Sequence, residues 1–273
     1  MTNPVSLVYR SVISVSGADA ETFLNGIVTV STPGMRTGEF RYGGLLTPQG
    51  KVIADLLLTR ENDALLIDCA EAVAPAVVKR LSLMKLRAAV AIAPRPDLGV
   101  TVFTGSPDPR AAAAPHRSIG PRTTPGDAGA YHAARIAAGL PEQGFDFAAE
   151  EVFPADINMD LIGGVDFRKG CFIGQEVVSR MKRRGAARRR TLAVEVAPAT
   201  EARTPILADG FEIGLLTSVS GGAGLARVRI DRLEEARAKG VAITAGGNPV
   251  VFDNPAWLAA ELAALNEAKE PRA

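Results

Sequence analysis

Residues 169–176 read Lys-Gly-Cys-Phe-Ile-Gly-Gln-Glu, which places a thiol between a cation and a carboxylate. A thiol reacts as its thiolate, and its pKa falls near a cation or near free backbone N–H groups at a helix N-terminus. Lys169 supplies the cation, and a helix-like segment follows the thiol as far as Arg180. The spacing predicts that Cys171 is a reactive thiol with Lys169 beside it. The structural alternative is a tight turn in which the cysteine only packs.

The residues around this thiol support the same prediction. Gly170 and Gly174 allow backbone conformations that other residues avoid, and they let a ligand approach the sulfur closely. Gln175 and Glu176 fall in the first turn of the expected helix, where a carboxylate is favoured by the helix dipole and can cap free N–H groups. Both are predicted members of the catalytic site, with capping as their structural alternative.

The elements expected to position this segment begin with a strand and a helix. Periodicity and turn signals predict strands over 6–15, 52–59 and 64–69, a helix after Asp19 and a helix over 72–84. Gly43-Gly44 and residues 47–50 are expected to form turns. Cys69 falls within an apolar run and is predicted to be buried.

The segment that begins the second half of the chain is predicted to have little regular secondary structure. Residues 95–129 are interpreted as mostly loop, with one strand over 100–103, and a helix is expected over 131–138. Short strands between residues 191 and 252 predict a small β-barrel or sandwich, followed by a helix over 256–268. Between these parts, Lys182 to Arg190 carries six cations at a predicted linker. This run is either a solvated surface or a site for a polyanion.

Composition limits the classes of function. The chain has 273 residues, 47% hydrophobic and 22% charged, with 31 basic against 30 acidic side chains. This near-zero balance gives no overall footprint for nucleic acid, so direct contact would be confined to Lys182 to Arg190. No segment has the roughly 18 uncharged apolar residues of a membrane span, so no membrane partner is expected. Two cysteines fit a reducing compartment, and a cytoplasmic location is predicted.

Residues 169–176 together with Arg180 resemble the signature of the YgfZ family, whose members are folate-binding relatives of the glycine-cleavage T-protein. Weaker matches lie at residues 46–51, at Asp108-Pro109-Arg110 and over 135–141. The resemblance implies an α+β fold, a T-protein-like ring of several modules. These would be a discontinuous folate-binding-like α/β domain (1–45 plus 115–185), an inserted ferredoxin-like domain (46–114) and a C-terminal β-barrel with a terminal helix (190–273).

The same resemblance implies a function. The family supports assembly, maintenance or repair of [4Fe-4S] clusters in client enzymes, one of which modifies tRNA, and it is linked to oxidative stress. Tetrahydrofolate is the implied cofactor, and iron–sulfur client enzymes or assembly proteins are the implied partners. The residues carried over to cofactor binding are Arg135, Asp156, Arg180, Gly170 and Gly174.

Cysteine chemistry favours an accessory factor over a classical enzyme or a cluster protein. An iron–sulfur cluster normally takes four thiolates, and this chain has two cysteines, so no stably bound cluster and no other metal is expected. Cys171 could instead be a transient cluster ligand. The alternatives are a tetrahydrofolate-dependent aminomethyl or one-carbon transferase and a non-catalytic scaffold or RNA-contact protein. A cysteine hydrolase is disfavoured, because His116 and His132 are interpreted as surface residues.

Overall fold

The structure, a computed structural model, describes residues 3–185 and 187–267. In chain order its elements are β1 Val5–Ser6, β2 Arg10–Ser16, α1 Ala20–Asn25, β3 Phe40–Leu46, β4 Val52–Glu61, β5 Ala64–Ala70, η1 Glu71–Val73, α2 Ala74–Met84, β6 Ala91–Pro94, β7 Leu98–Ser106, β8 Arg117–Pro121, α3 Gly129–Ala137, η2 Pro154–Ile157, α4 Gln175–Arg183, β9 Arg189–Val196, β10 Pro205–Ala208, β11 Phe211–Ser220, β12 Ala223–Arg229, α5 Ile230–Lys239, β13 Ile243–Ala245, β14 Asn248–Phe252 and α6 Ala256–Glu267.

A five-stranded antiparallel sheet forms the N-terminal half, in the order β3-β4-β5-β2-β6. Its strands are runs of Val, Ile and Leu that fit a pleated sheet buried on both faces. Helices α1 and α2 cover one face, where side chains such as Leu24, Val77 and Leu81 join the apolar core. The predicted strand–helix start and the second strand pair are confirmed.

Two glycines predicted to form a turn lie instead inside β3. A Cβ at Gly43 would come 2.6 Å from the Val30 side chain, and one at Gly44 would come 2.9 Å from Met159. These glycines therefore make room for residues packed over the strand. The turn comes later, at residues 47–50, as expected.

Residues 95–129 are more regular than predicted. They contain β7 and β8, which form a three-stranded antiparallel sheet with β1 in the order β1-β7-β8. Leu7, Val100 and Val102 pack there against Tyr131 of α3. The alternation of apolar side chains is short and interrupted by Pro and Gly, which is why the sequence alone indicated loop.

The C-terminal part is a closed antiparallel barrel, in the order β10-β11-β12-β9-β14-β13. It confirms the predicted barrel, and α6 confirms the predicted terminal helix as far as Glu267; Ala268 lies outside the described residues. Helix α5 was not predicted, because the segment was expected to hold only strands. Its Ile230, Leu233 and Ala236 are buried in the barrel core.

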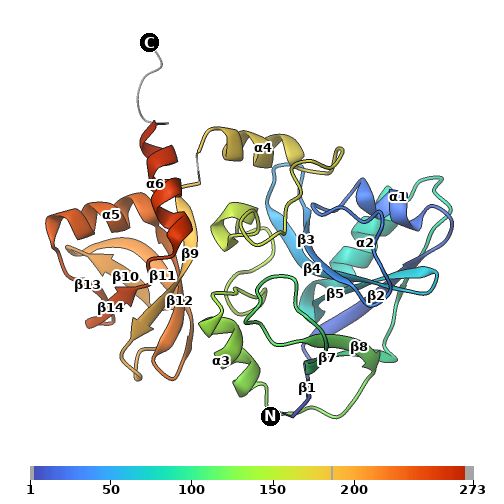
Figure 1. Cartoon of the computed structure of the whole chain (residues 1–273), viewed down its shortest axis with the longest axis horizontal. Coiled ribbons are helices and arrows are strands. Elements are labelled where there is room, and N and C mark those ends of the chain that lie inside the picture. The colour runs from blue at the N-terminus through green and yellow to red at the C-terminus, as the bar shows by residue number, and fades with distance from the viewer. Residues whose placement is uncertain (1–2, 186, 268–273) are drawn as a thin grey trace.

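Figure 1 shows the barrel and the sheets on opposite sides of the molecule, with α3 and the chain that follows it between them and α4 above. Helix α3 contacts β11 and β12. The predicted boundary between the first two modules, after residue 45, falls inside β3, and the five-stranded sheet takes strands from both modules. The division into three modules stays a prediction. None of the helices in the described ranges combines the length and apolarity required to cross a bilayer.

Candidate functional site

Cys171 lies on an exposed loop that leads into α4. At the start of the loop, the Asp166 carboxylate accepts the backbone N–H of Lys169 at 3.2 Å. At its end, Gly174 is the residue before α4 and has a φ of 80°. A Cβ there would lie 2.7 Å from the carbonyl oxygen of Thr47, so glycine lets the loop pack on the β3–β4 turn. The thiol therefore faces solvent from a loop that is fixed at both ends.

Lys169 fixes this loop to a distant part of the chain. Its Nζ donates to the carbonyl oxygens of Asn25 at 2.6 Å, Val28 at 2.6 Å and Val30 at 3.0 Å. Burial lowers the pKa of Lys169 to about 8, and the charge of Asp166 acts in the opposite direction. All three ammonium protons thus have backbone acceptors. The structure gives Lys169 a positioning role, and its role as a cation beside the thiolate stays a prediction.

Gln175 and Glu176 occupy the first turn of α4, as predicted. Neither side chain caps the helix. Glu176 and Arg180 are exposed, and over residues 3–185 and 187–267 no hydrogen bond or ion pair joins them to another side chain. The solvent-facing side of α4 therefore presents one negative and one positive side chain, Glu176 and Arg180, to a partner protein.

Cys69 is fully buried in β5 within the core beneath α2, as predicted. Burial raises the pKa of its thiol to about 12. It is therefore a packing residue, and Cys171 is the accessible thiol of this chain.

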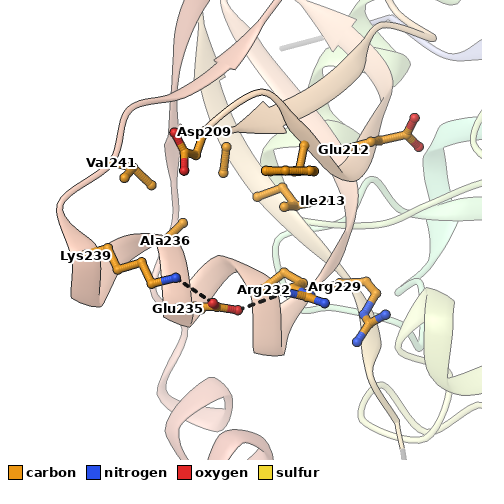
Figure 2. Close-up of a pocket in the computed structure, with 11 residues that line it drawn as sticks. Asp209, Glu212, Ile213, Arg229, Arg232, Glu235, Ala236, Lys239 and Val241 are labelled. Carbon is orange, nitrogen blue, oxygen red and sulfur yellow. Dashed lines mark hydrogen bonds and ion pairs between the residues drawn. The ribbon is translucent and has the colours of Figure 1, made fainter.

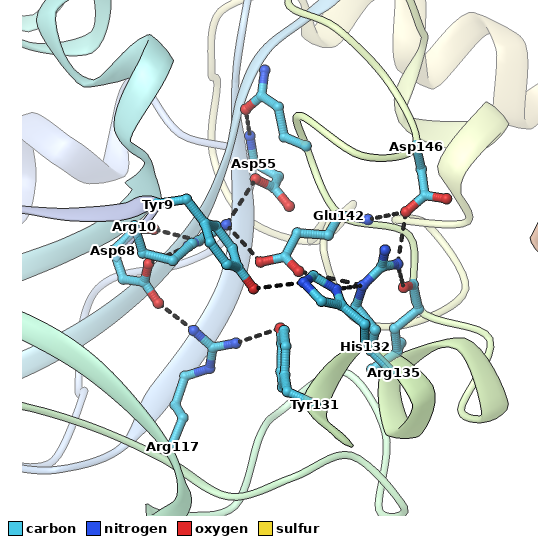
Figure 3. Close-up of polar contacts among 12 residues, drawn as sticks. Tyr9, Arg10, Asp55, Asp68, Arg117, Tyr131, His132, Arg135, Glu142 and Asp146 are labelled. Carbon is cyan, nitrogen blue, oxygen red and sulfur yellow. Dashed lines mark hydrogen bonds and ion pairs between the residues drawn. The ribbon is translucent and has the colours of Figure 1, made fainter. Parts of the chain in front are cut away.

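The fold also encloses a buried set of charged side chains that the sequence did not predict, here called the central charge network. Figure 3 labels its members except Asp108 and Arg110. Each member is at most 4% exposed. The members are Arg10, Asp55, Asp68, Asp108, Arg110, Arg117, Arg135, Glu142 and Asp146. They come from the two sheets, from the segment between β7 and β8, and from α3 with the turn after it.

Arg10 is the centre of this network. Its Nε donates to Asp68 at 2.6 Å, and its Nη1 lies 3.4 Å from Glu142 and 3.7 Å from Asp55. Arg117 pairs with Asp68 from the other side. Buried carboxylates are costly unless paired, and these guanidinium groups neutralise them inside the fold.

Arg135, predicted to bind a cofactor, belongs to the same network. Its Nη1 donates to Asp146 at 2.7 Å and to the carbonyl of Leu140 at 3.1 Å, while Nη2 donates to Ser218 of the barrel at 3.0 Å. Its Nε lies 3.4 Å from Glu142. The guanidinium therefore joins α3 to the barrel, and four of its five N–H donors are used within the chain, the fourth on His132.

His132 is not a simple surface residue, contrary to the expectation. Its ring stacks on Tyr9 at 5.7 Å and lies 4.4 Å from the ring of Phe145. Its Nδ1 accepts a bond from Arg135 Nε at 2.9 Å. Burial and the nearby Arg135 charge lower the pKa of His132. The neutral ring thus packs at the edge of the network.

The five residues predicted to bind folate come from several elements. Arg135 is buried in the network, Asp156 lies in η2, and Arg180 is exposed on α4. Gly170 has no atom within 4 Å of an added Cβ, and Gly174 packs on the β3–β4 turn. Their role in binding a cofactor stays a prediction.

The basic run is also divided. Arg190 is 1% exposed and pairs with Asp160 at 2.5 Å and with Glu261 of α6. Lys182 lies 3.6 Å from the same Asp160. The remaining arginines of the run are exposed. Two of the six cations are therefore committed to ion pairs that attach α6 to the rest of the fold.

Lys182 and Arg190 line one cavity, and Arg188 and Arg189 line another. A further cavity, of about 450 Å³, lies on the barrel between the β10–β11 hairpin and α5 and holds three cations and three acids (Figure 2). Glu235 pairs there with Arg232 and Lys239, so the positive and negative side chains that line this cavity largely neutralise one another. Across residues 3–185 and 187–267, no three or more His, Cys, Asp or Glu side chains are grouped to hold a metal ion.

The fold resembles that of a solved enzyme. The glycine cleavage system aminomethyltransferase T from Bartonella henselae aligns over 93% of this chain and 85% of its own, with a TM-score of 0.73 and 16% identity. This likeness confirms the predicted T-protein-like α+β fold. Residues 188–260 match the family described as CAF17, C-terminal beta-barrel domain.

Similar sequences identify the family. The mitochondrial iron-sulfur cluster assembly factor IBA57 of Homo sapiens is 28% identical over 82% of this chain and 77% of its own. The Mus musculus protein is 30% identical, with coverage of 77% and 69%, and the Pyricularia oryzae homologue is 31% identical, with coverage of 67% and 54%. The chain thus spans little more than half of the Pyricularia relative.

These relatives confirm one expectation at a coarser level and contradict another. They carry the IBA57 name, so the expected family is confirmed only as the superfamily that YgfZ and IBA57 share. Each is a mitochondrial protein, which contradicts the predicted cytoplasmic location. Two free cysteines indicate only a compartment where thiols persist. On its identity to the mouse protein over more than two thirds of that relative, the chain belongs to the family of IBA57 iron–sulfur cluster assembly factors.

Proposed function

We propose that this protein is an accessory factor in the assembly of iron–sulfur clusters, and that Cys171 is its point of contact with the cluster. The observation that carries the proposal is the contrast between an exposed Cys171 on a fixed loop and a buried Cys69. The role named for its relatives supports it. Because a cluster normally takes four thiolates, one accessible thiol requires the other ligands to come from a partner protein. In this proposal the cluster is a substrate that the protein hands on, and it is not a resident cofactor.

The chemistry asked of Cys171 is ligand exchange. The thiol loses its proton to solvent and its sulfur binds iron in place of another ligand, without a change of oxidation state in the protein. The contacts of Lys169 and Gly174 hold the loop in one position, so little order has to be gained when a partner docks. Assembly proteins or client enzymes are the proposed partners. The names of the relatives give no support to a role in tRNA modification or in oxidative stress, so the proposed function includes neither.

Tetrahydrofolate does not enter this proposal. The five residues predicted to bind it come from α3, η2, α4 and the loop before α4, and Arg135 uses three of its five donors on Asp146, Leu140 and Ser218. A pterin's N–H groups would need carboxylate acceptors, and among the described residues the buried oxygens Glu142 Oε2 and Asp55 Oδ1 have no hydrogen-bond partner. Tetrahydrofolate binding stays a prediction, and we derive no step through it and give aminomethyl transfer no support.

The test replaces the cell's own copy with the Cys171→Ser variant and measures the activity of [4Fe-4S] enzymes. We expect a selective fall in these activities, with enzymes that lack clusters unaffected. Cys69→Ala is the matched control, because it removes the other thiol from the core and should leave the activities near normal. Full activity with a correctly folded Cys171→Ser protein would contradict the proposal.

A further inference from the structure

A cavity of about 470 Å³, here called the inter-module pocket, lies where the barrel meets the N-terminal half. Strands β9, β11 and β12 line one side, and the residues around η2, α4 and the start of β4 line the other. Its cations are Lys51, Arg188, Arg189 and Arg227. Ligand sites in proteins commonly have roughly this volume and often lie between modules.

Part of this charge is already matched. Arg227 pairs with Glu151, whose other carboxylate oxygen accepts the backbone N–H of Ala148 at 2.8 Å. The Asp156 carboxylate accepts the backbone N–H of Phe153 at 2.9 Å, and burial raises its pKa. These contacts fix the walls of the pocket.

Lys51 keeps donors for a ligand. Its Nζ donates to the carbonyl oxygen of Glu151 at 2.8 Å and lies 3.9 Å above the centre of the Phe153 ring. An ammonium has three protons, and the described contacts use one of them in a hydrogen bond. The ammonium is therefore held in place with donors to spare.

Arg188 and Arg189 supply the remaining positive charge. Both are exposed, and among the described residues neither side chain takes part in an ion pair or hydrogen bond. Glu212 is the exposed acid of the pocket, so the lining holds four cations against three acids. A guanidinium fork matches the oxygens of a phosphate in a bidentate manner.

We propose that the inter-module pocket binds a small phosphate-bearing molecule through Lys51, Arg188 and Arg189. Three side chains with unused donors would surround one dianionic group. The site is separate from Cys171, and it assigns a ligand-binding role to Arg188 and Arg189, the part of the basic run that lines the pocket. It goes beyond the proposed role in cluster assembly.

The test is calorimetric titration of the whole protein with pyrophosphate at low ionic strength. We expect saturable binding of one pyrophosphate, weakened about tenfold or more in the double variant Arg188→Gln/Arg189→Gln. The matched control is Arg183→Gln/Arg184→Gln, which removes two exposed charges of the same run outside the pocket and should bind as the native protein does.

Three results would overturn the proposal: no binding to the native protein, an equal loss in both double variants, or binding of succinate as tight as that of pyrophosphate. The last would make the pocket a carboxylate site. The Cys171→Ser variant should bind pyrophosphate normally, so failure here is distinguishable from failure of the proposed assembly role.

Discussion

Replacing Arg10 by methionine would break the central charge network at its most connected point. Asp68 would keep Arg117 and Glu142 would keep Arg135, but Asp55 would lose the one cation that lies within ion-pair distance of it among the described residues. Removing one partner of a buried pair typically costs about 3–5 kcal/mol, because a charge is left without compensation. We therefore expect Arg10→Met to lower the free energy of unfolding by about that amount, measured by urea titration with far-UV circular dichroism.

Two comparisons make this measurement specific to the orphaned carboxylate. Adding Asp55→Asn to Arg10→Met should recover part of the loss, because the uncompensated charge is gone. Arg229→Met, which breaks the part-exposed pair with Asp231, is the matched control and should cost at most about 1 kcal/mol. An Arg10→Met protein no less stable than the control would refute the reasoning.

The loss should also depend on pH. Burial already raises the pKa of Asp55, and without Arg10 its charged form is disfavoured further. A carboxyl with a raised folded-state pKa lowers stability as pH rises through that value. The difference between Arg10→Met and the native protein should therefore shrink as the pH is lowered from 7 towards 4; a constant difference would count against Asp55 as the cause.

Three further outcomes are expected. Gly174→Ala should destabilise the protein by about 1–3 kcal/mol in the same urea titration, because its φ is 80° and its Cβ would meet the Thr47 carbonyl at 2.7 Å. The control is Gly163→Ala, which should cost less, because Gly163 has a φ of 76° but no neighbour within 4 Å of an added Cβ. Because the Cys69 pKa of about 12 lies above the unfolded value of 9.0, native stability should fall relative to Cys69→Ala above pH 9, by about 1 kcal/mol at pH 10; parallel pH profiles would contradict this. Lys169→Met should leave three carbonyls without their donor and speed hydrogen exchange of the backbone amides in the loop that carries Cys171, and an unchanged rate would show that the loop does not depend on them.

The elements with strong apolar periodicity could be predicted from the sequence. Strand β5, helix α2 and the barrel strands were found because their Val, Ile and Leu follow the spacing of one buried face. Strand β3 was obscured by Gly43-Gly44, which are glycines for reasons of packing against Val30 and Met159. That cause lies in the tertiary structure and leaves no local signal.

The candidate site was predictable only in part. The motif around Cys171 identified the exposed thiol, since local residue types carry it. The central charge network was missed because its members are spread from Arg10 to Asp146 and meet only in the fold. One signal was present: Arg10 and Asp68 are single charges inside the strands predicted over 6–15 and 64–69, and a buried strand carries a charge only with a partner.

The bonds of Lys169 have a consequence for motion. They tie the cysteine loop to residues 25–30, where Ile27 and Val28 are buried in the core beneath the sheet. The loop opens only when these three bonds break, so its opening free energy lies above that of an ordinary surface loop. In hydrogen exchange, the backbone amides of the loop would then exchange more slowly than those of a loop without such contacts, although the bonds join segments about 140 residues apart. A solvent-exposed thiol is thereby carried on slowly exchanging backbone.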